Sequence, residues 1–256
     1  GGRQMTSHFG TRSLNEDGSW KKLTEQKNSS ADISPTAGQM PRLLGLAQAS
    51  KYYRNVPQAD TENKFSVSGN EIAFGTIGDA STSEGHFWET INAKGVLQVP
   101  LAVFVWDDGY GISVPKKFQT TKASVSDALS GMQKREGTNG FNIYKVKGWD
   151  YAGMCEVFEE GIRLARETHT PVLFHVEEIT QPQGHSTSGS HERYKSQERL
   201  EWEREWDGIK KLKEWIIANA LAEEHELDEI AAKAKEYVRE SREAARAKFI
   251  TTVKKQ

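Results

Sequence analysis

Two short apolar segments, each followed by a carboxylate, constrain the fold of this chain more than any other feature. Residues 71–77 and 100–106 are apolar and β-rich, as buried parallel strands are. Residues 84–97 between them have the length and composition of a helix. Asp79 and Asp108 follow the two apolar segments and stand 29 residues apart (108 − 79). The pattern predicts a β-α-β unit with both carboxylates at strand carboxyl ends, where open α/β sheets bind ligands.

The alternation of strand and helix patterns continues on both sides of this unit. Residues 39–53 have the apolar spacing of a helix, 141–146 of a strand, 151–168 of a helix and 171–176 of a strand. Residues 1–32 are polar and rich in Gly, Ser and Asn, which is typical of loop. The fold class predicted by this order is α/β, a doubly wound parallel sheet.

The last part of the chain has a different character. Residues 192–256 hold 15 acidic and 15 basic residues, with apolar residues at steps of three and four. This spacing predicts two amphipathic helices that pack on the domain, with a solvated charged face and a remainder open to partner docking. We therefore divide the chain into an α/β binding domain, residues 1–196, and a C-terminal helical extension, residues 197–256.

The residue types at the strand ends suit a metal ion bound to a phosphorylated ligand. Asp79, Asp108 and the backbone carbonyl of Tyr110 offer the hard oxygen ligands that magnesium prefers. The small residues Ala80 and Ser81 let the backbone approach an anion, and the following helix directs free N–H groups toward it. Taken alone, each carboxylate is also typical of a helix cap or a turn. Taken together, they predict a magnesium-diphosphate site.

The residues around this unit, and two segments farther away, follow a specific order. They are Gly-Asp-Ala-Ser at 78–81, Glu84-Gly85, Glu89, Asn92-Ala93, Pro100, Asp-Asp-Gly-Tyr at 107–110, Ile112-Ser113, residues 33–41 upstream, and residues 184–188 and 193–196 downstream. This order resembles the alpha subunit, or the alpha region of a fused alpha-beta chain, of the thiamine-diphosphate-dependent 2-oxo acid dehydrogenase decarboxylase component. The branched-chain (2-oxoisovalerate) type matches best, over roughly residues 1–215.

The resemblance implies a thiamine-diphosphate-binding fold and the cofactors thiamine diphosphate and magnesium. The implied reaction is oxidative decarboxylation of a 2-oxo acid, branched-chain or pyruvate, with transfer of the acyl group to a lipoyl group. His185 matches the family's active-site histidine beside the cofactor. The remaining implied cofactor-binding residues are Ser34 and Thr36 at the aminopyrimidine, Ala80 and Ser81 at the diphosphate, and Asp79, Asp108 and Tyr110 at the metal.

The resemblance also implies partners. They are a beta subunit or beta domain, which supplies a glutamate for thiamine activation, a lipoyl acyltransferase and the 2-oxo acid. We expect an α2β2 assembly or a dimer of fused chains. Because the sequence opens at Gly1 within what the family has as a longer domain, we also expect an N-terminal part to be missing.

Four other side chains have predicted roles. Ser186 and Ser196 match the spacing of serines that are phosphorylated in mitochondrial relatives, so they are candidate regulatory sites; a hydroxyl that only orders the loop is the alternative. His175, in an apolar strand, and His191 match no family position and are predicted to be structural.

The chain departs from the family pattern in ways that make the site more negative. Asp107 and Asp108 stand where relatives have two asparagines, Trp106 where they have an arginine, and Gln181 where the loop has another arginine. We therefore expect metal to bind well and diphosphate less well.

Composition excludes some classes of partner. The formal charge is −2, which gives no electrostatic footprint for nucleic acid or an acidic membrane, and Cys155 is the only cysteine. We find no secretory signal or membrane-spanning run, and we expect a cytoplasmic protein. Two alternatives stay open at this point, another thiamine-dependent enzyme of the transketolase kind and a cofactor-free module that only binds a partner chain.

Overall fold

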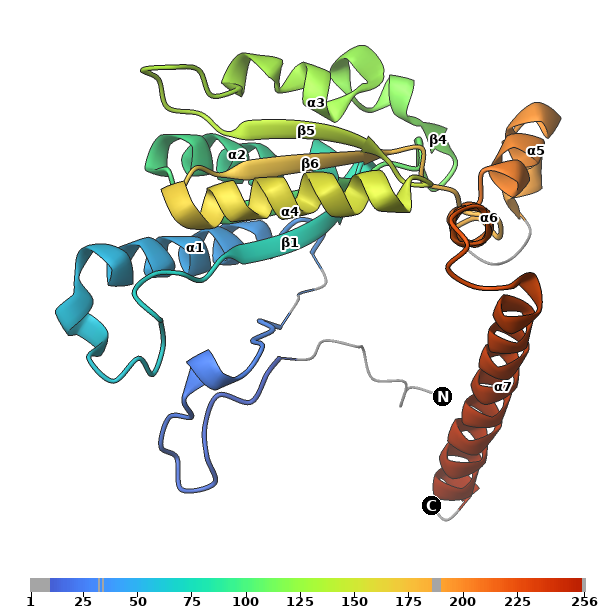
Figure 1. Cartoon of the computed structure of the whole chain (residues 1–256), viewed down its shortest axis with the longest axis horizontal. Helices are drawn as coiled ribbons and strands as arrows, with labels where there is room; N and C mark the ends of the chain where they lie inside the picture. Colours follow the sequence, from blue (N-terminus) through green and yellow to red (C-terminus); the bar gives the residue numbers. More distant parts are fainter. Residues whose placement is uncertain (1–9, 32, 34, 186–189, 255–256) are drawn as a thin grey trace.

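The core of the molecule is a four-stranded parallel sheet (Figure 1). The computed structural model describes residues 10–31, 33, 35–185 and 190–254. The strands are β1 (Ala73–Gly78), β2 (Leu101–Trp106), β5 (Asn142–Lys147) and β6 (Val172–Glu177), in the order β1-β2-β6-β5. β2 and β6 are central and almost continuously apolar, because both of their faces are buried.

Helices cover both faces of this sheet (Figure 1). On one face, α1 (Met40–Asn55), α2 (Gly85–Leu97) and the short α3 (Val125–Ala128) contribute to a core that includes Leu101, Val103 and Val105 of β2. On the other, α4 (Tyr151–Thr168) packs with Ala102 and Phe104. Alternate residues of β2 thus enter opposite cores, as the two-residue period of a strand requires. The predicted doubly wound α/β sheet is confirmed.

The predicted boundaries of these elements are close to the observed ones. The helix expected at 151–168 is α4 itself, and it begins where the Asp150 side chain accepts a hydrogen bond from the Gly153 N–H at 2.9 Å. The strands begin one or two residues later than predicted. Residues 10–31 are mostly loop, as expected, with a 3-10 turn at Leu23–Glu25 and an isolated antiparallel bridge between Leu14 and Trp20.

Short elements connect the strands to the site. A 3-10 turn, Ala80–Ser83, joins β1 to α2. After β2, a small antiparallel pair, β3 (Tyr110–Gly111) and β4 (Val114–Pro115), folds the chain back on itself. Among the described residues, no helix combines the length and the apolar character needed to span a lipid bilayer.

The tail differs from its prediction in two respects. It forms three helices rather than two, α5 (Gln197–Glu205), α6 (Gly208–Ala218) and α7 (Glu224–Lys254), because Asp207 caps a new helix through the N–H groups of Ile209 and Lys210, both at 3.1 Å. The expected packing of the tail on the domain is wrong for α7, which has no buried residue over its described length and extends away from the sheet (Figure 1). The division at residues 196 and 197 stays a prediction.

One core residue is unexpected. Lys94 of α2 is fully buried, with its ammonium 3.0 Å from the Val172 carbonyl oxygen and 4.3 Å from the centre of the Phe141 ring. Burial lowers the pKa of Lys94 well below its ordinary value, because neither neighbour carries a negative charge.

This burial predicts a pH-dependent stability. Between the lowered pKa of folded Lys94 and the ordinary pKa of about 10.4, the unfolded chain binds more protons, so stability rises with pH. Lys94→Met, which keeps the volume and removes the amine, should raise the melting temperature most at pH 6 and progressively less toward pH 10. Thermal unfolding measured across this range checks it, with the exposed Lys248→Met as control. A gain that stays constant with pH would contradict the assignment.

Candidate functional site

Strand pairing brings the predicted carboxylates to one edge of the sheet. Gly78 of β1 is in register with Trp106 of β2, so Asp79 and Asp107 directly follow two paired residues. The Asp79 N–H donates to the Trp106 carbonyl at 3.1 Å, and the Asp107 N–H donates to the Val176 carbonyl of β6 at 2.9 Å. These bonds extend the sheet by one residue and fix both backbones at its carboxyl edge.

The Asp79 carboxylate is in an unfavourable environment. The residue is 4% exposed, and its Oδ2 is buried without a hydrogen-bond partner among the described residues. Asp79 precedes the 3-10 turn, but its side chain makes no capping bond, so the helix-cap alternative does not explain it. Burial, and then the nearby Asp107 and Asp108, raise the pKa of Asp79 to about 7. A divalent cation would relieve both the desolvation and the repulsion.

The surroundings of Asp107 and Asp108 shift the pKa values of the two carboxylates in opposite directions. Burial would raise the pKa of Asp107, but hydrogen bonds from His175 and Lys116 outweigh it and lower that pKa. The pKa of Asp108 is raised, chiefly by burial, and its Oδ1 accepts the Tyr110 N–H at 3.1 Å. Asp107 is therefore a charge-compensated carboxylate, whereas Asp108, like Asp79, still favours a cation nearby.

The turn that carries Tyr110 is held from a second side by α5 and the residues before it. Arg199 donates from Nη2 to the Asp108 carbonyl oxygen at 2.8 Å. The Lys195 ammonium and the Arg199 guanidinium lie 5.1 and 5.5 Å from the centre of the Tyr110 ring. Both cations bind the buried Glu203, Lys195 at 2.7 Å and Arg199 at 2.8 Å. This contact was not predicted from the sequence, because its partners are 91 residues apart.

A cavity of about 300 Å³ lies against the carboxyl end of β1. Thr36 and Ser81, both predicted cofactor-binding residues, line it together with Gly78 and Trp106. Gln39 lines it as well, and its Oε1 is buried without a hydrogen-bond partner among the described residues. A bound molecule with a hydrogen-bond donor would satisfy this acceptor. The described lining contains no lysine or arginine.

The other predicted site residues are placed as follows. Ala80 stands in the 3-10 turn, close to Gly111 of β3, where an added Cβ would meet the Ala80 Cβ at 2.8 Å. His185 is exposed and is not among the described residues that line the cavity. Ser196 caps α5 by accepting the Arg199 N–H at 3.3 Å. Ser34 and Ser186 lie outside the described residues.

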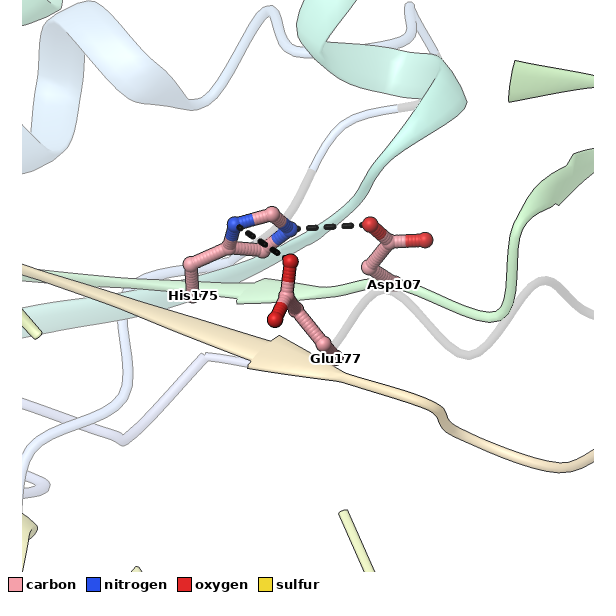
Figure 2. Close-up of side chains that lie close together, drawn as sticks. All are labelled: Asp107, His175 and Glu177. Carbon is pink, nitrogen blue, oxygen red and sulfur yellow. Dashed lines mark hydrogen bonds and ion pairs between the residues drawn. The ribbon is translucent and has the colours of Figure 1, made fainter. Parts of the chain in front are cut away.

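A cluster that sequence reasoning missed lies beside the turn (Figure 2). Asp107, His175 and Glu177 bring potential metal-ligating atoms within 4.8 Å of one another, the only such group in the described part of the chain. His175 is fully buried, with Nε2 2.9 Å from Asp107 Oδ2 and Nδ1 3.8 Å from Glu177 Oε1. The available signal was a histidine in a central apolar strand, where an imidazole needs a polar partner.

Fold and site together define a class of protein. It is a doubly wound α/β protein whose candidate ligand site lies at the carboxyl ends of adjacent parallel strands, where carboxylates and a small-residue turn stand next to a cavity. Residues 3–254 match the family model described as dehydrogenase E1 component, and the chain belongs to this family. The resemblance noted from the sequence is thereby confirmed.

Known proteins with similar sequences carry two kinds of name. The chain is 25% identical over 203 residues to a pyruvate dehydrogenase E1 component subunit alpha of Rickettsia bellii, covering 79% of this chain and 55% of that protein. It is 28% identical over 217 residues to a mitochondrial 2-oxoisovalerate dehydrogenase subunit alpha of Caenorhabditis elegans, covering 84% and 42%. The chain thus spans about half the length of these relatives.

Among solved structures, transketolase from Campylobacter jejuni is similar with a TM-score of 0.45 and 15% identity, covering 70% of this chain and 25% of that one.

The environment of Asp79 predicts that removing its charge stabilises the metal-free chain. Because its pKa is raised from 3.8 to about 7, stability falls as pH rises between these values and stays low above them. At pH 8 in chelator, Asp79→Asn should unfold with a free energy about 2–4 kcal/mol higher than the parent, and the gain should vanish near pH 4. Denaturant unfolding measures it, with exposed Glu240→Gln as control. A destabilised Asp79→Asn at pH 8 would contradict the account.

Proposed function

We propose that this chain is the alpha portion of a thiamine-diphosphate-dependent 2-oxo acid dehydrogenase. The reaction is oxidative decarboxylation of a 2-oxo acid with transfer of the acyl group to a lipoyl group. The observation that carries the proposal is the buried carboxylate of Asp79 at the paired strand ends, whose Oδ2 has no hydrogen-bond partner among the described residues, next to a cavity that Gly78 and Ser81 line. Membership of the dehydrogenase E1 component family supports the same conclusion.

In this proposal Asp79, Asp108 and the Tyr110 carbonyl bind magnesium. The raised pKa of Asp79 and of Asp108 supports this ligand set, because both carboxylates lack full charge compensation. Asp107 stays out of the set, since Lys116 and His175 already bind its Oδ2 at 2.7 and 2.9 Å. Oxygen ligands of this kind suit a hard divalent cation, which the protein typically shares with the phosphate oxygens of a ligand.

The cavity beside the metal site would take the cofactor. Ala80 and Ser81 are small residues before the N-terminus of α2, where N–H groups and the helix dipole favour an anionic diphosphate. Thr36 would border the aminopyrimidine, together with Ser34. Thiamine diphosphate bound there would supply the nucleophilic carbon needed to decarboxylate a 2-oxo acid. The chain's own share is to bind the metal and diphosphate, orient the ring and exclude water.

The remaining roles follow from the family. His185 would assist acyl transfer from the exposed loop, and Ser186 and Ser196 would be regulatory sites. The partners would be a beta subunit or domain, a lipoyl acyltransferase and the 2-oxo acid, in an α2β2 assembly or a dimer of fused chains. Relatives named for pyruvate and for 2-oxoisovalerate both match, so either acid is a candidate substrate.

Titration calorimetry tests this function. The chain, completed with the N-terminal part of its domain and a beta partner, should bind thiamine diphosphate saturably in the presence of magnesium. Asp79→Ala should abolish the binding, whereas Asp127→Ala, an exposed aspartate paired with Lys145, should not change it. Absence of binding by a folded parent assembly would contradict the proposal and favour a module that only binds a partner chain.

A second prediction concerns the charge of the site. Trp106 lines the cavity, and the described lining of the cavity holds no basic side chain. The negative charge of the diphosphate would therefore be compensated mainly by the metal ion. Thiamine diphosphate should therefore bind much more weakly at low magnesium. Trp106→Arg should raise the affinity at low magnesium by about fivefold, the effect of roughly 1 kcal/mol for one charge pair. The same titration checks it, with Trp106→Gln as the neutral control, and equal affinities for the two variants would refute the charge argument.

A further inference from the structure

We propose that His175 is a positioning residue for the metal-binding turn and acts through Asp107. The inference rests on the proposed function, because it concerns the turn that presents Asp108 and Tyr110 to magnesium. It adds a residue that the family resemblance left as merely structural. Asp107 directly follows β2, His175 lies in the neighbouring strand β6, and their side chains face each other (Figure 2).

Asp107 organises the turn through three hydrogen bonds. Its Oδ1 accepts the Gly109 N–H at 2.8 Å, and its Oδ2 accepts both the Lys116 ammonium at 2.7 Å and His175 Nε2 at 2.9 Å. The Lys116 N–H also donates to the Gly109 carbonyl at 2.9 Å. Both ends of the segment 107–116 are thus held together by the Asp107 carboxylate, and Asp108 and Tyr110 lie in the loop between these ends.

His175 is itself fixed on its other side. The ring is fully buried, and Nδ1 lies 2.8 Å from the Ser126 hydroxyl, which lies 3.3 Å from the Ser124 hydroxyl. With Nε2–H donating to Asp107, Nδ1 accepts the Ser126 proton, so one tautomer satisfies both contacts. Asp107 therefore receives a donor that cannot rotate away, because Ser126 and the packed sheet hold the ring.

The same cluster is poorly suited to bind a metal ion of its own. A cation between Asp107, His175 and Glu177 would have to displace the Lys116 ammonium from Asp107 Oδ2. His175 Nε2 already faces that oxygen, and Nδ1 faces Ser126. These contacts favour a positioning role, in which His175 supports the turn that carries the metal ligands. Residues that hydrogen-bond directly to metal ligands typically change metal affinity by tenfold to a hundredfold, and we expect the lower end of this range for His175, which acts through Asp107.

Manganese binding by the full chain tests the inference, with the electron paramagnetic resonance signal of free Mn²⁺ as readout. His175→Phe keeps the ring volume and removes both hydrogen bonds, and it should raise the Mn²⁺ dissociation constant about tenfold or more. His175→Gln keeps one side-chain donor, and it should bind within about threefold of the parent if that donor reaches Asp107. Thermal unfolding confirms that each variant is folded at the assay temperature. A purely structural role would change the melting temperature without this difference in Mn²⁺ affinity between His175→Phe and His175→Gln.

Ser126→Ala provides a milder variant should His175→Phe fail to fold. It removes the hydrogen bond that fixes the ring and should weaken Mn²⁺ binding by about threefold, in the same direction. Equal Mn²⁺ affinity in His175→Phe, Ser126→Ala and the parent, with binding still lost in Asp79→Ala, would overturn the positioning role and leave the proposed function intact.

Two further outcomes separate the inference from the proposed function. If the folded parent chain does not bind Mn²⁺, the metal site fails and the positioning role falls with it. If binding survives Asp79→Ala and disappears in Glu177→Gln, the cluster in Figure 2 is itself the metal site, and the positioning role is wrong.

Discussion

The parallel pairing of β1 with β2 brings the carboxylates of Asp79, Asp107 and Asp108 to the same edge of the sheet. The other contacts at the site compensate these negative charges unequally. Asp79 and Asp107 follow residues that are hydrogen-bonded neighbours in the sheet, and Asp108 comes next. Burial, and then the negative charges of Asp107 and Asp108, raise the pKa of Asp79 to about 7. The protein compensates one of the three with Lys116 and His175, and it leaves Asp79 with a buried oxygen that lacks a partner among the described residues.

This unequal charge compensation distinguishes the role of Asp107 from that of Asp79 and Asp108. The charge-compensated Asp107 acts as the fixed point of the turn, whereas Asp79 and Asp108 remain available to a cation. From the opposite side, the Lys195–Glu203–Arg199 cluster holds the Asp108 carbonyl and the Tyr110 ring, so the turn is supported both by the sheet and by α5. Removing one member of the buried Lys195–Glu203 pair would leave an uncompensated buried charge, which is strongly destabilising.

The sequence predicted the sheet, its helices and the carboxylates at the strand ends, because these depend on local periodicity. Helix 151–168 was predicted residue for residue, because its apolar spacing marks it. The partners of Asp107 were not predictable, because His175 is 68 residues away and meets it only through strand order. The break at Asp207 was missed, since apolar spacing alone does not show a cap, and the isolation of α7 was missed because its apolar residues suggested a partner within the chain.

The central claim is that Asp79 and Asp108 bind one divalent metal ion while Asp107 positions the turn between them. Anomalous X-ray diffraction from crystals of the chain grown with Mn²⁺ tests it directly. We expect one strong anomalous peak in contact with the Asp79 carboxylate, the Asp108 carboxylate and the Tyr110 carbonyl oxygen, with Lys116 still bound to Asp107. A peak among Asp107, His175 and Glu177, or ordered crystals in which Asp79 contacts no metal, would contradict it.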